Sequence, residues 1–219
     1  MARERVATDE SVGASHTMPH YVECFMAQLA IPSKASTIIV VRPAAATGFE
    51  VLLTRRPQEM IFLGGYLVFP GGAIEKQDFS ETMLSRCRGL SPAEAQMILG
   101  GDLSPELSMA HWIAAVRELF EETGIYFFIN EDGEPLNAKP DDSMTRLSEK
   151  RKALSAGRID FPHLLESERL FCDLSRVRYL FHRVTPEKYP VRFDTRFYLS
   201  ALPQNQISLP SSAEVAESL

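Results

Sequence analysis

Apolar residues in the first third of the chain follow the spacing of β-strands. Residues 36–42 are rich in β-branched side chains, residues 49–55 have a similar character, and residues 43–48 between them carry proline and glycine. This pattern predicts an antiparallel hairpin. Residues 60–69 are apolar and aromatic and lead into a pair of glycines, which predicts a strand entering a loop whose backbone approaches another group closely.

The longest helical pattern covers residues 105–123. Ser104 before it is a favoured N-cap, Pro105 suits the first helical position, and Gly124 provides a C-terminal stop. These signals predict a single long helix. Upstream of it, residues 79–103 contain two short helical patterns broken by turns, and we interpret them as a helical insertion.

The other segments divide the chain into an N-terminal extension and one domain. Residues 1–33 are interpreted as a polar tail followed by a short helix that stops at Pro32, and residues 34–219 as a single domain. The further elements expected in this domain are a strand at 125–129, a loop at 130–142, a charged surface helix at 143–156, and a strand pair at 177–184 and 191–201.

Polar and apolar side chains alternate along the last of these strands. One face carries Phe193, Thr195, Phe197 and Leu199, and the other carries Arg192, Asp194, Arg196 and Tyr198. The alternation predicts a half-buried strand, and we expect its polar face to point into a cleft.

A run of basic residues lies in the helix expected at 143–156. Its members are Arg146, Lys150, Arg151 and Lys152. Such a run either binds phosphate groups or forms a solvated helix face, and the solvated face is the favoured interpretation.

Composition and charge narrow the classes of partner. The 219 residues are 45% apolar and 24% charged, as in ordinary folded proteins. A net charge of −6 offers no general attraction for nucleic acid or anionic lipid, so neither is expected as a partner.

No apolar stretch approaches the roughly 18 residues of a membrane span, and the first residues lack the layout of a secretory signal. Cys24, Cys87 and Cys172 form no CxxC pair, so a reducing, cytoplasmic location is expected.

The long helix separates its apolar side chains from a group of glutamates. Successive helical residues turn by about 100°, which places Glu121 and Glu122 within about 60° of Glu118. The apolar residues lie nearly opposite. His111 shares the glutamate face, two turns earlier, where we expect it either to touch a ligand or to be exposed.

These glutamates lower the stability of the helix that carries them. Glu121 and Glu122 lie in the last turn, where each anion costs about 0.3–1 kcal/mol, and Glu118 repels Glu122 across one turn. Arg117 can pair with Glu121, but one cation does not neutralise three carboxylates. A divalent cation with oxygen ligands would do so, whereas the alternative is a solvated acidic face. The glycine-rich segment upstream favours the metal site.

The residues 117–125, with the sequence RELFEETGI, resemble the second half of the Nudix box, REUXEEXGU, at every specified position. The first half of the box, a glycine followed five residues later by glutamate, resembles the segment from Gly72 to Asp78, preceded by the FPG of residues 69–71. Residues 79–116 then separate the two halves, where the common box has seven residues, which amounts to an insertion of 31 residues.

A similar interruption is found in the Nudix branch that includes a peroxisomal coenzyme A diphosphatase. The strand RFDTRF at residues 192–197 also resembles that branch. The resemblance covers the chain from about residue 36 to its end. It implies an α+β fold, a Nudix-type α/β/α sandwich with a mixed β-sheet, in which the insertion inside the Nudix box forms a helical flap near the cleft.

The same resemblance implies the chemistry. Nudix enzymes hydrolyse a diphosphate linked to a nucleoside, with Mg²⁺ or Mn²⁺ as the cofactor. The metal ligands would be Glu118, Glu121 and Glu122. Glu118 and Glu121 are also catalytic candidates, and whether Glu121 is a ligand or the general base stays open. Arg117 would hold the carboxylates in register.

Four further residues are candidates for contact with the substrate. The backbone of Gly71 and Gly72 would shape the phosphate and metal pocket, and Arg55 and Arg56 could contact phosphate. The favoured substrate is coenzyme A or an acyl-CoA. Alternatives are ADP-ribose, a dinucleotide or a nucleotide sugar, or a Nudix domain that binds its ligand as a regulator without turnover. Homodimers are common among relatives.

The sequence departs from the family pattern at Asp78 and at its C-terminal end. Asp78 is one methylene shorter than the glutamate of the box, so its role is open. Relatives usually continue through a tryptophan-containing segment to a closing helix, whereas this sequence ends at Leu219, so we expect a shortened C-terminus. Glu214 and Glu217 lie where some relatives place an additional metal-binding or catalytic glutamate.

Overall fold

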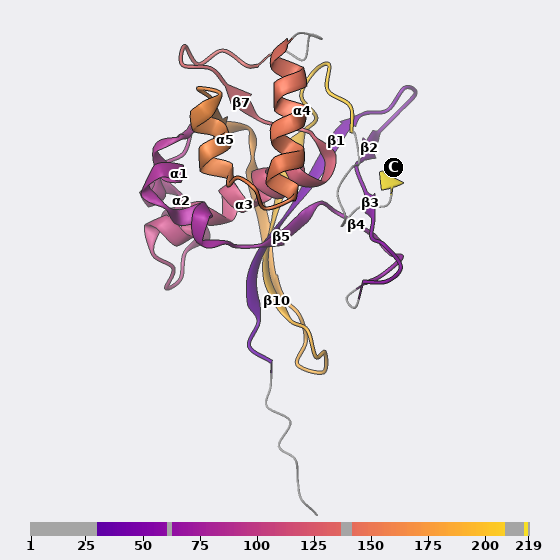
Figure 1. Ribbon diagram of the computed structural model, residues 1–219. Helices are drawn as coiled ribbons and strands as arrows, with labels where there is room; N and C mark the ends of the chain where they lie inside the picture. Colours follow the sequence, from indigo (N-terminus) through magenta and orange to yellow (C-terminus); the bar gives the residue numbers. More distant parts are fainter. Residues whose placement is uncertain (1–29, 61–62, 137–141, 209–216, 219) are drawn as a thin grey trace, which may run out of the picture.

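The computed structural model of the protein describes residues 30–60, 63–136, 142–208 and 217–218 (Figure 1). The helices are α1 (Glu81–Ser85), α2 (Pro92–Leu99), α3 (Pro105–Thr123), α4 (Asp142–Ser155) and α5 (Phe161–Ser167), with short 3₁₀ turns η1 (Lys76–Phe79) and η2 (Leu174–Arg176). The strands are β1 (Ser33–Pro43), β2 (Phe49–Val51), β3 (Thr54–Arg55), β4 (Leu67–Val68), β5 (Gly71–Ala73), β6 (Cys87–Arg88), β7 (Phe128–Ile129), β8 (Phe171–Asp173), β9 (Arg178–Val184), β10 (Phe193–Ala201) and β11 (Glu217–Ser218). The tail and short helix expected before residue 30 lie outside the described residues.

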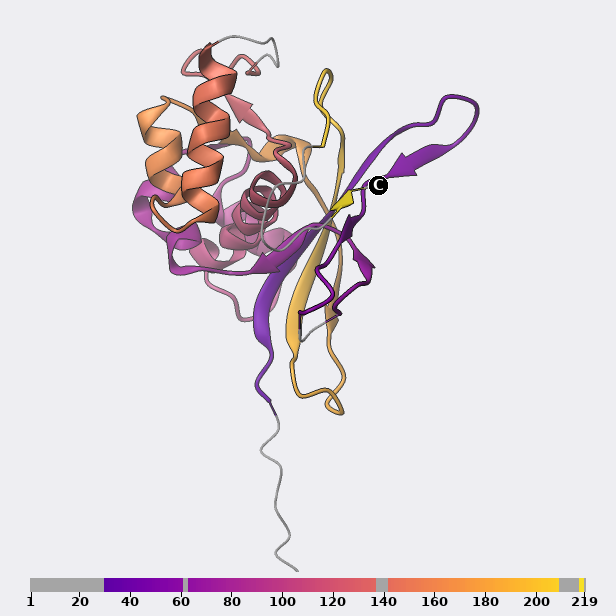
Figure 2. The ribbon, with the colours of Figure 1, turned by 45° about the vertical axis from the view of Figure 1, so that its right-hand side comes forward.

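A five-stranded mixed sheet forms the centre of the fold. Its strand order is β2-β1-β10-β9, and β5 pairs with the first half of β1. β1 and β10 run parallel, from Ser33 opposite Phe193 to Val41 opposite Ala201, whereas the other pairs are antiparallel. In the two ribbon views the helices lie on one side of this sheet, and β3 and β4 lie on the other (Figures 1 and 2). The predicted α+β class with a mixed sheet is confirmed.

The hairpin predicted from residues 36–55 is confirmed in part. β2 pairs with the end of β1, with Val51 opposite Val41. The second arm then stops, because β5 occupies the same edge of β1 farther back, with Gly72 opposite Ser36. The chain instead turns away into β3, which forms a small separate sheet between β4 and β11. The strand predicted at 60–69 is likewise reduced to Leu67–Val68.

The long helix α3 begins and ends at the predicted residues. The side chain of Ser104 accepts a hydrogen bond from the Leu107 backbone N–H at 3.2 Å, and Pro105 occupies the first turn. Gly124 ends the helix in the left-handed conformation, with φ of 77°, and its N–H bonds to the Phe120 carbonyl. The predicted helix at 143–156 is also present, as α4.

The helical insertion contains α1 and α2, as predicted, and also the short strand β6. β6 pairs with β8, which lies beside β7 in a third small sheet. In this pairing Cys87 is opposite Cys172, and both are buried free thiols. β8 and the preceding helix α5 were not predicted, because both elements are too short to show a clear periodicity. The strand expected at 125–129 pairs only at Phe128–Ile129.

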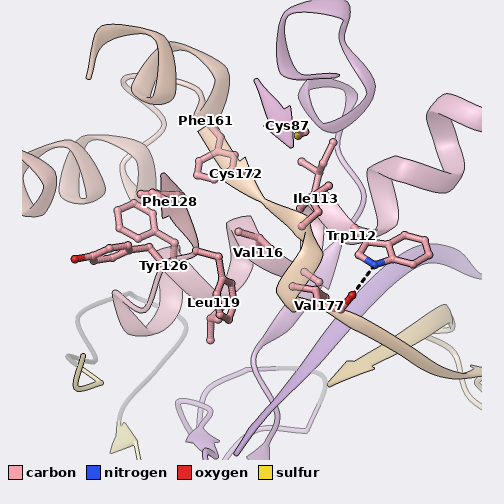
Figure 3. Close-up of a cluster of buried hydrophobic side chains, with 14 of the residues drawn as sticks. Cys87, Trp112, Ile113, Val116, Leu119, Tyr126, Phe128, Phe161, Cys172 and Val177 are labelled. Atoms are coloured by element: carbon pink, nitrogen blue, oxygen red, sulfur yellow. Dashed lines mark hydrogen bonds between the residues drawn. The ribbon is translucent and has the colours of Figure 1, made fainter. Parts of the chain in front are cut away.

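The core surrounds α3. On one side the Trp112 indole N–H donates to the Val177 carbonyl at 3.1 Å (Figure 3). The Phe120 ring packs beside those of Phe128 and Phe161. On the other side the helix packs against β1 and β5. The helix is therefore buried over nearly its whole circumference, because the sheet covers the side that carries the glutamates.

This arrangement corrects the expectation for His111. The imidazole is 0% exposed, and its Nδ1 lies 3.0 Å from the Ser36 hydroxyl of β1. Burial lowers the pKa of His111 to about 3, and the positive charge of Arg196 adds to this effect, whereas the negative charge of Asp194 opposes it. His111 is thus a neutral residue of the helix–sheet interface rather than an exposed one.

The orientation of β10 also differs from the prediction. The face with Asp194, Arg196 and Tyr198 turns toward α3, where the Tyr198 ring lies 4.9 Å from that of Trp112. The opposite face, with Phe193 and Phe197, lines a hollow. The polar side of the strand is therefore the covered one. Its charges are satisfied there, because Arg196 forms an ion pair with Asp194 at 2.6 Å.

Candidate active site

Arg117 connects the two halves of the candidate site. Its guanidinium binds both carboxylate oxygens of Asp78, with Nε donating at 2.8 Å and Nη2 at 3.1 Å. Nη2 also donates to the Ala73 carbonyl at 2.9 Å, while Nη1 donates to Glu118 at 2.8 Å and to Glu121 at 3.3 Å. Arg117, only 1% exposed, thereby joins α3 to β5 and η1.

Asp78 has a structural role that the sequence left open. Its carboxylate is fully buried and also accepts the Glu75 backbone N–H at 2.8 Å. Burial raises the pKa of Asp78, and the charge of Arg117 opposes this shift. Burial alone would lower the pKa of Arg117, but the carboxylates of Glu118 and Asp78 raise it. The shorter aspartate therefore still reaches the arginine, and Arg117 keeps its charge.

The two glycines of β5 permit two close approaches. A Cβ atom on Gly72 would lie 2.5 Å from the carboxylate carbon of Glu118, and one on Gly71 would lie 2.7 Å from the Thr37 Cα. Gly71 therefore allows β5 to pair with β1, and Gly72 leaves room for the Glu118 carboxylate. The predicted close approach of this glycine segment is confirmed, and its partners are β1 and Glu118.

Glu121 and Glu122 lie one turn beyond Glu118, close to the end of α3. Glu122 is 4% exposed, and Glu121 is partly buried. Burial raises the pKa of Glu121, and the pairing with Arg117 acts in the opposite direction. The three carboxylates therefore do not form a solvated acidic face, which was the alternative interpretation of this helix.

Arg151 is a residue of this region whose role the sequence pattern did not reveal. It is 7% exposed, and its Nε and Nη2 both donate to the Glu121 carbonyl at 3.1 Å. The side chain thus covers the C-terminal end of α3, where a cation is favourable. The interpretation of the basic run as a solvated face is wrong for Arg151, because α4 packs across the end of α3. Neighbouring Lys152 is exposed, as expected.

A hollow of about 600 Å³ lies on the face of the central sheet away from α3. Gly71 and Gly72 form part of its wall, and Glu118 lies against Gly72, although none of the three glutamates lines the hollow itself. Arg56 also lines the hollow, whereas Arg55 does not and instead donates to the Gly65 carbonyl at 3.2 Å. Of the two predicted phosphate contacts, only Arg56 lines the same hollow as the glycines.

A second hollow, of about 780 Å³, is lined by Glu75 and Glu121 and by the connection between α4 and α5. Arg158 and His163 face it, and no sequence signal had distinguished these two residues. Residues 79–103 line neither hollow, although a flap near the cleft was expected. The insertion instead packs on α3 through α2.

The remaining acidic candidates lie near the end of the chain. Glu214 falls outside the described residues. Glu217 belongs to β11, where its backbone pairs opposite Arg55 of β3. Across the described residues, no helix is long and apolar enough to cross a membrane.

Comparisons with known proteins agree with this arrangement. A sequence model of the NUDT19 Nudix domain matches residues 26–218. The chain is 28% identical over 181 residues to the acyl-coenzyme A diphosphatase NUDT19 of Xenopus laevis, covering 70% of this chain and 47% of the relative. The chain thus spans about half the length of that protein.

A solved structure supports the same assignment. The fold is similar to that of a NUDIX hydrolase from Alicyclobacillus acidocaldarius, with 31% identity and a TM-score of 0.65, covering 88% of this chain and 79% of the other. The Arg117–Asp78 pair joins the two parts of the interrupted box in space. Because the family match extends over most of the chain and the fold agrees with it, the chain belongs to the Nudix hydrolase family, as a NUDT19-type Nudix domain.

Proposed function

We propose that the protein is a metal-dependent hydrolase that cleaves the diphosphate of a nucleoside diphosphate linked to another group, with coenzyme A or an acyl-CoA as the favoured substrate. The observation that carries this proposal is the position of Glu118. Its carboxylate lies against the bare backbone of Gly72, a residue that lines a hollow, and two further glutamates follow within the next turn.

The donor set fits a magnesium-like ion. Glu118, Glu121 and Glu122 offer only carboxylate oxygens, which Mg²⁺ and Mn²⁺ prefer as ligands. Among the described residues, no group of three or more His, Cys, Asp or Glu side chains is arranged to hold a metal ion. Two of the three carboxylates, those of Glu118 and Glu121, are instead bound by Arg117. We propose that these carboxylates exchange contacts with Arg117 for contacts with the ion.

Each residue then has a defined part in the reaction. When bound, the ion supplies charge to the diphosphate and lowers the pKa of a water molecule. Glu118 and Glu122 hold the ion, and Glu121 serves either as a third ligand or as the general base. Arg117 fixes the orientation of the carboxylates, since Asp78 in turn fixes Arg117.

The substrate assignment is supported by a relative and by the hollow. The similar protein from Xenopus laevis is named as an acyl-coenzyme A diphosphatase. The hollow beside Gly72 combines Arg56 with the aromatic side chains of Phe193 and Phe197, which suits a nucleotide. ADP-ribose, dinucleotides and nucleotide sugars share the diphosphate and are the competing substrates.

The proposal is tested by product release. The purified chain is incubated with coenzyme A, acetyl-CoA, ADP-ribose, a dinucleotide and a nucleotide sugar, in the presence of Mg²⁺ or Mn²⁺, and the products are separated by chromatography. We expect adenosine 3′,5′-bisphosphate from coenzyme A, with chelation by EDTA stopping the reaction. Tight binding of one compound without any product would instead favour the regulator.

A matched pair of variants then tests the site. Glu122→Gln is expected to lower the rate by at least about a hundredfold and to leave the fold intact. Glu106→Gln, at an exposed position of the first turn of the same helix, is the control and should keep the full rate. An unchanged rate in Glu122→Gln would rule out the proposed mechanism. The cytoplasmic location and the homodimer stay predictions from the sequence.

A further inference from the structure

The hollow beside Gly72 carries positive charge without any acidic residue in its described lining. Arg56 and Arg183 are its two charged residues. Other arginines of the sheet are bound within the protein: Arg196 pairs with Asp194, and Arg192 donates to the carbonyls of Thr185 and Ala30. Unlike Arg192 and Arg196, the two arginines of the hollow have no such partner among the described residues.

Neither guanidinium of the hollow has a partner among the described residues. The Nε of Arg56 is buried and makes no hydrogen bond. No hydrogen bond or ion pair joins the guanidinium of Arg183 to another described group. Arg183 is exposed, so an anionic ligand in the hollow can reach its guanidinium, and a guanidinium–phosphate pair is a strong, charge-assisted contact.

The pairing of the strands places Arg183 far from the glutamates. Arg183 is opposite Thr195 of β10, Thr195 is opposite Ala35 of β1, and Ala35 is opposite Ala73 of β5. Arg183 thus lies three strand spacings, or about 14 Å, from the residue that follows Gly72. A diphosphate held at Glu118 and Gly72 would leave Arg183 available for a different anionic group of the same ligand.

The wall between these two ends is aromatic. Phe193 and Phe197 lie on the hollow face of β10, and the Phe197 ring stacks on that of Phe181 with centroids 4.5 Å apart. A planar base can stack on such side chains. The hollow therefore presents a phosphate end, an aromatic middle and a second cationic end.

We infer that Arg183 binds a phosphate monoester on the nucleoside part of the substrate, separate from the diphosphate that is cleaved. This inference rests on the proposed function and narrows its substrate class. Coenzyme A carries such a group, the 3′-phosphate of its adenosine, whereas dephospho-CoA, ADP-ribose and most nucleotide sugars do not. Arg183 is accordingly a specificity-determining residue.

The first test compares two substrates that differ only in this phosphate. For the wild type, kcat/KM for coenzyme A should exceed that for 3′-dephospho-CoA by about tenfold or more, the scale of a charge-assisted hydrogen bond. Arg183→Gln should reduce this ratio toward one, and Arg183→Lys, which keeps the charge, should preserve part of it. Arg178→Gln, an exposed arginine on the same strand outside the hollow, is the control and should keep the wild-type ratio.

A binding experiment separates this inference from the proposed function. Adenosine 3′,5′-bisphosphate and AMP are titrated calorimetrically into the metal-free wild type and into Arg183→Gln, with thermal unfolding as the check on folding. Tighter binding of the bisphosphate that is lost in Arg183→Gln supports the subsite, even if no substrate is hydrolysed. Hydrolysis of coenzyme A with equal kcat/KM for both substrates, and equal binding of the two nucleotides, would overturn the subsite and leave the hydrolase intact.

Discussion

The Glu118 carboxylate lies where a side chain on Gly72 would have to be. A Cβ atom at Gly72 would come within 2.5 Å of its carboxylate carbon, so the glycine and the glutamate share one space at the junction of β5 and α3. The two residues belong to opposite halves of the interrupted box. Their contact shows that the two halves of the motif meet in space despite the long insertion between them.

Gly72→Ala is expected to affect activity more than stability. The new methyl group meets the end of a side chain, which can move away, so we expect a loss of less than about 1 kcal/mol in the free energy of unfolding. The displaced Glu118 should lower kcat by at least about tenfold. Kinetics and urea unfolding of the same preparation measure both effects. Full activity in Gly72→Ala would show that the position of Glu118 is not critical.

Gly71→Ala provides the contrast. Its Cβ would lie 2.7 Å from the Thr37 Cα, a backbone atom that cannot move without separating β5 from β1. We expect a loss of about 1–3 kcal/mol in the free energy of unfolding. Urea unfolding of the two glycine variants should therefore rank Gly71→Ala as clearly the less stable one, and the reverse order would contradict the assigned contacts.

Asp78→Asn tests the buried pair with Arg117. The substitution removes the negative charge and leaves a buried guanidinium partly uncompensated, which should cost about 3–5 kcal/mol of stability. Asp102→Asn, at an exposed position of the loop before α3, is the control and should stay within about 0.5 kcal/mol of the wild type. Chemical denaturation measures both. A small effect of Asp78→Asn would mean that the ion pair with Arg117 contributes little to the free energy of unfolding.

The pKa of His111 predicts how stability depends on pH. Burial lowers this pKa from its ordinary value of 6.5 to about 3, so between these values the unfolded chain binds a proton that the folded protein does not. The contribution of His111 is therefore complete above about pH 6.5 and is lost as the pH falls toward 3, by about 2 kcal/mol at pH 5. Urea unfolding of the wild type and of His111→Gln between pH 7 and pH 4.5 should give a shallower decline for the variant. Parallel declines would contradict the assignment.

The sequence predicted best what local chemistry determines. The ends of α3 follow from Ser104 and Gly124, which act through their own turns. The clustering of Glu118, Glu121 and Glu122 follows from the helical repeat alone. Predicting these features requires no knowledge of the neighbouring elements, and the structure agrees with the predictions.

The features that sequence reasoning missed depend on contacts between distant segments. The partner of Asp78 lies 39 positions along the chain, at Arg117, across the insertion. The burial of His111 depends on β1, and the covered face of β10 depends on α3. In each case the side chain itself gives no sign of which element will pack on it. Arg183 is similar, since only the register of the strands brings it to the hollow.

Arg151→Met tests whether the end of α3 needs its cation. Without the two hydrogen bonds to the Glu121 carbonyl, the last turn should lose about 1–2 kcal/mol of stability, and the turn that carries Glu121 and Glu122 should become less ordered. We therefore expect kcat to fall while KM changes little, because the loss concerns the carboxylates rather than the hollow. Arg151→Lys, which can still reach a carbonyl with one donor, should recover part of kcat. Lys152→Met, exposed on the same helix, is the control, and an equal effect from both methionine variants would assign the loss to the charge of α4 in general.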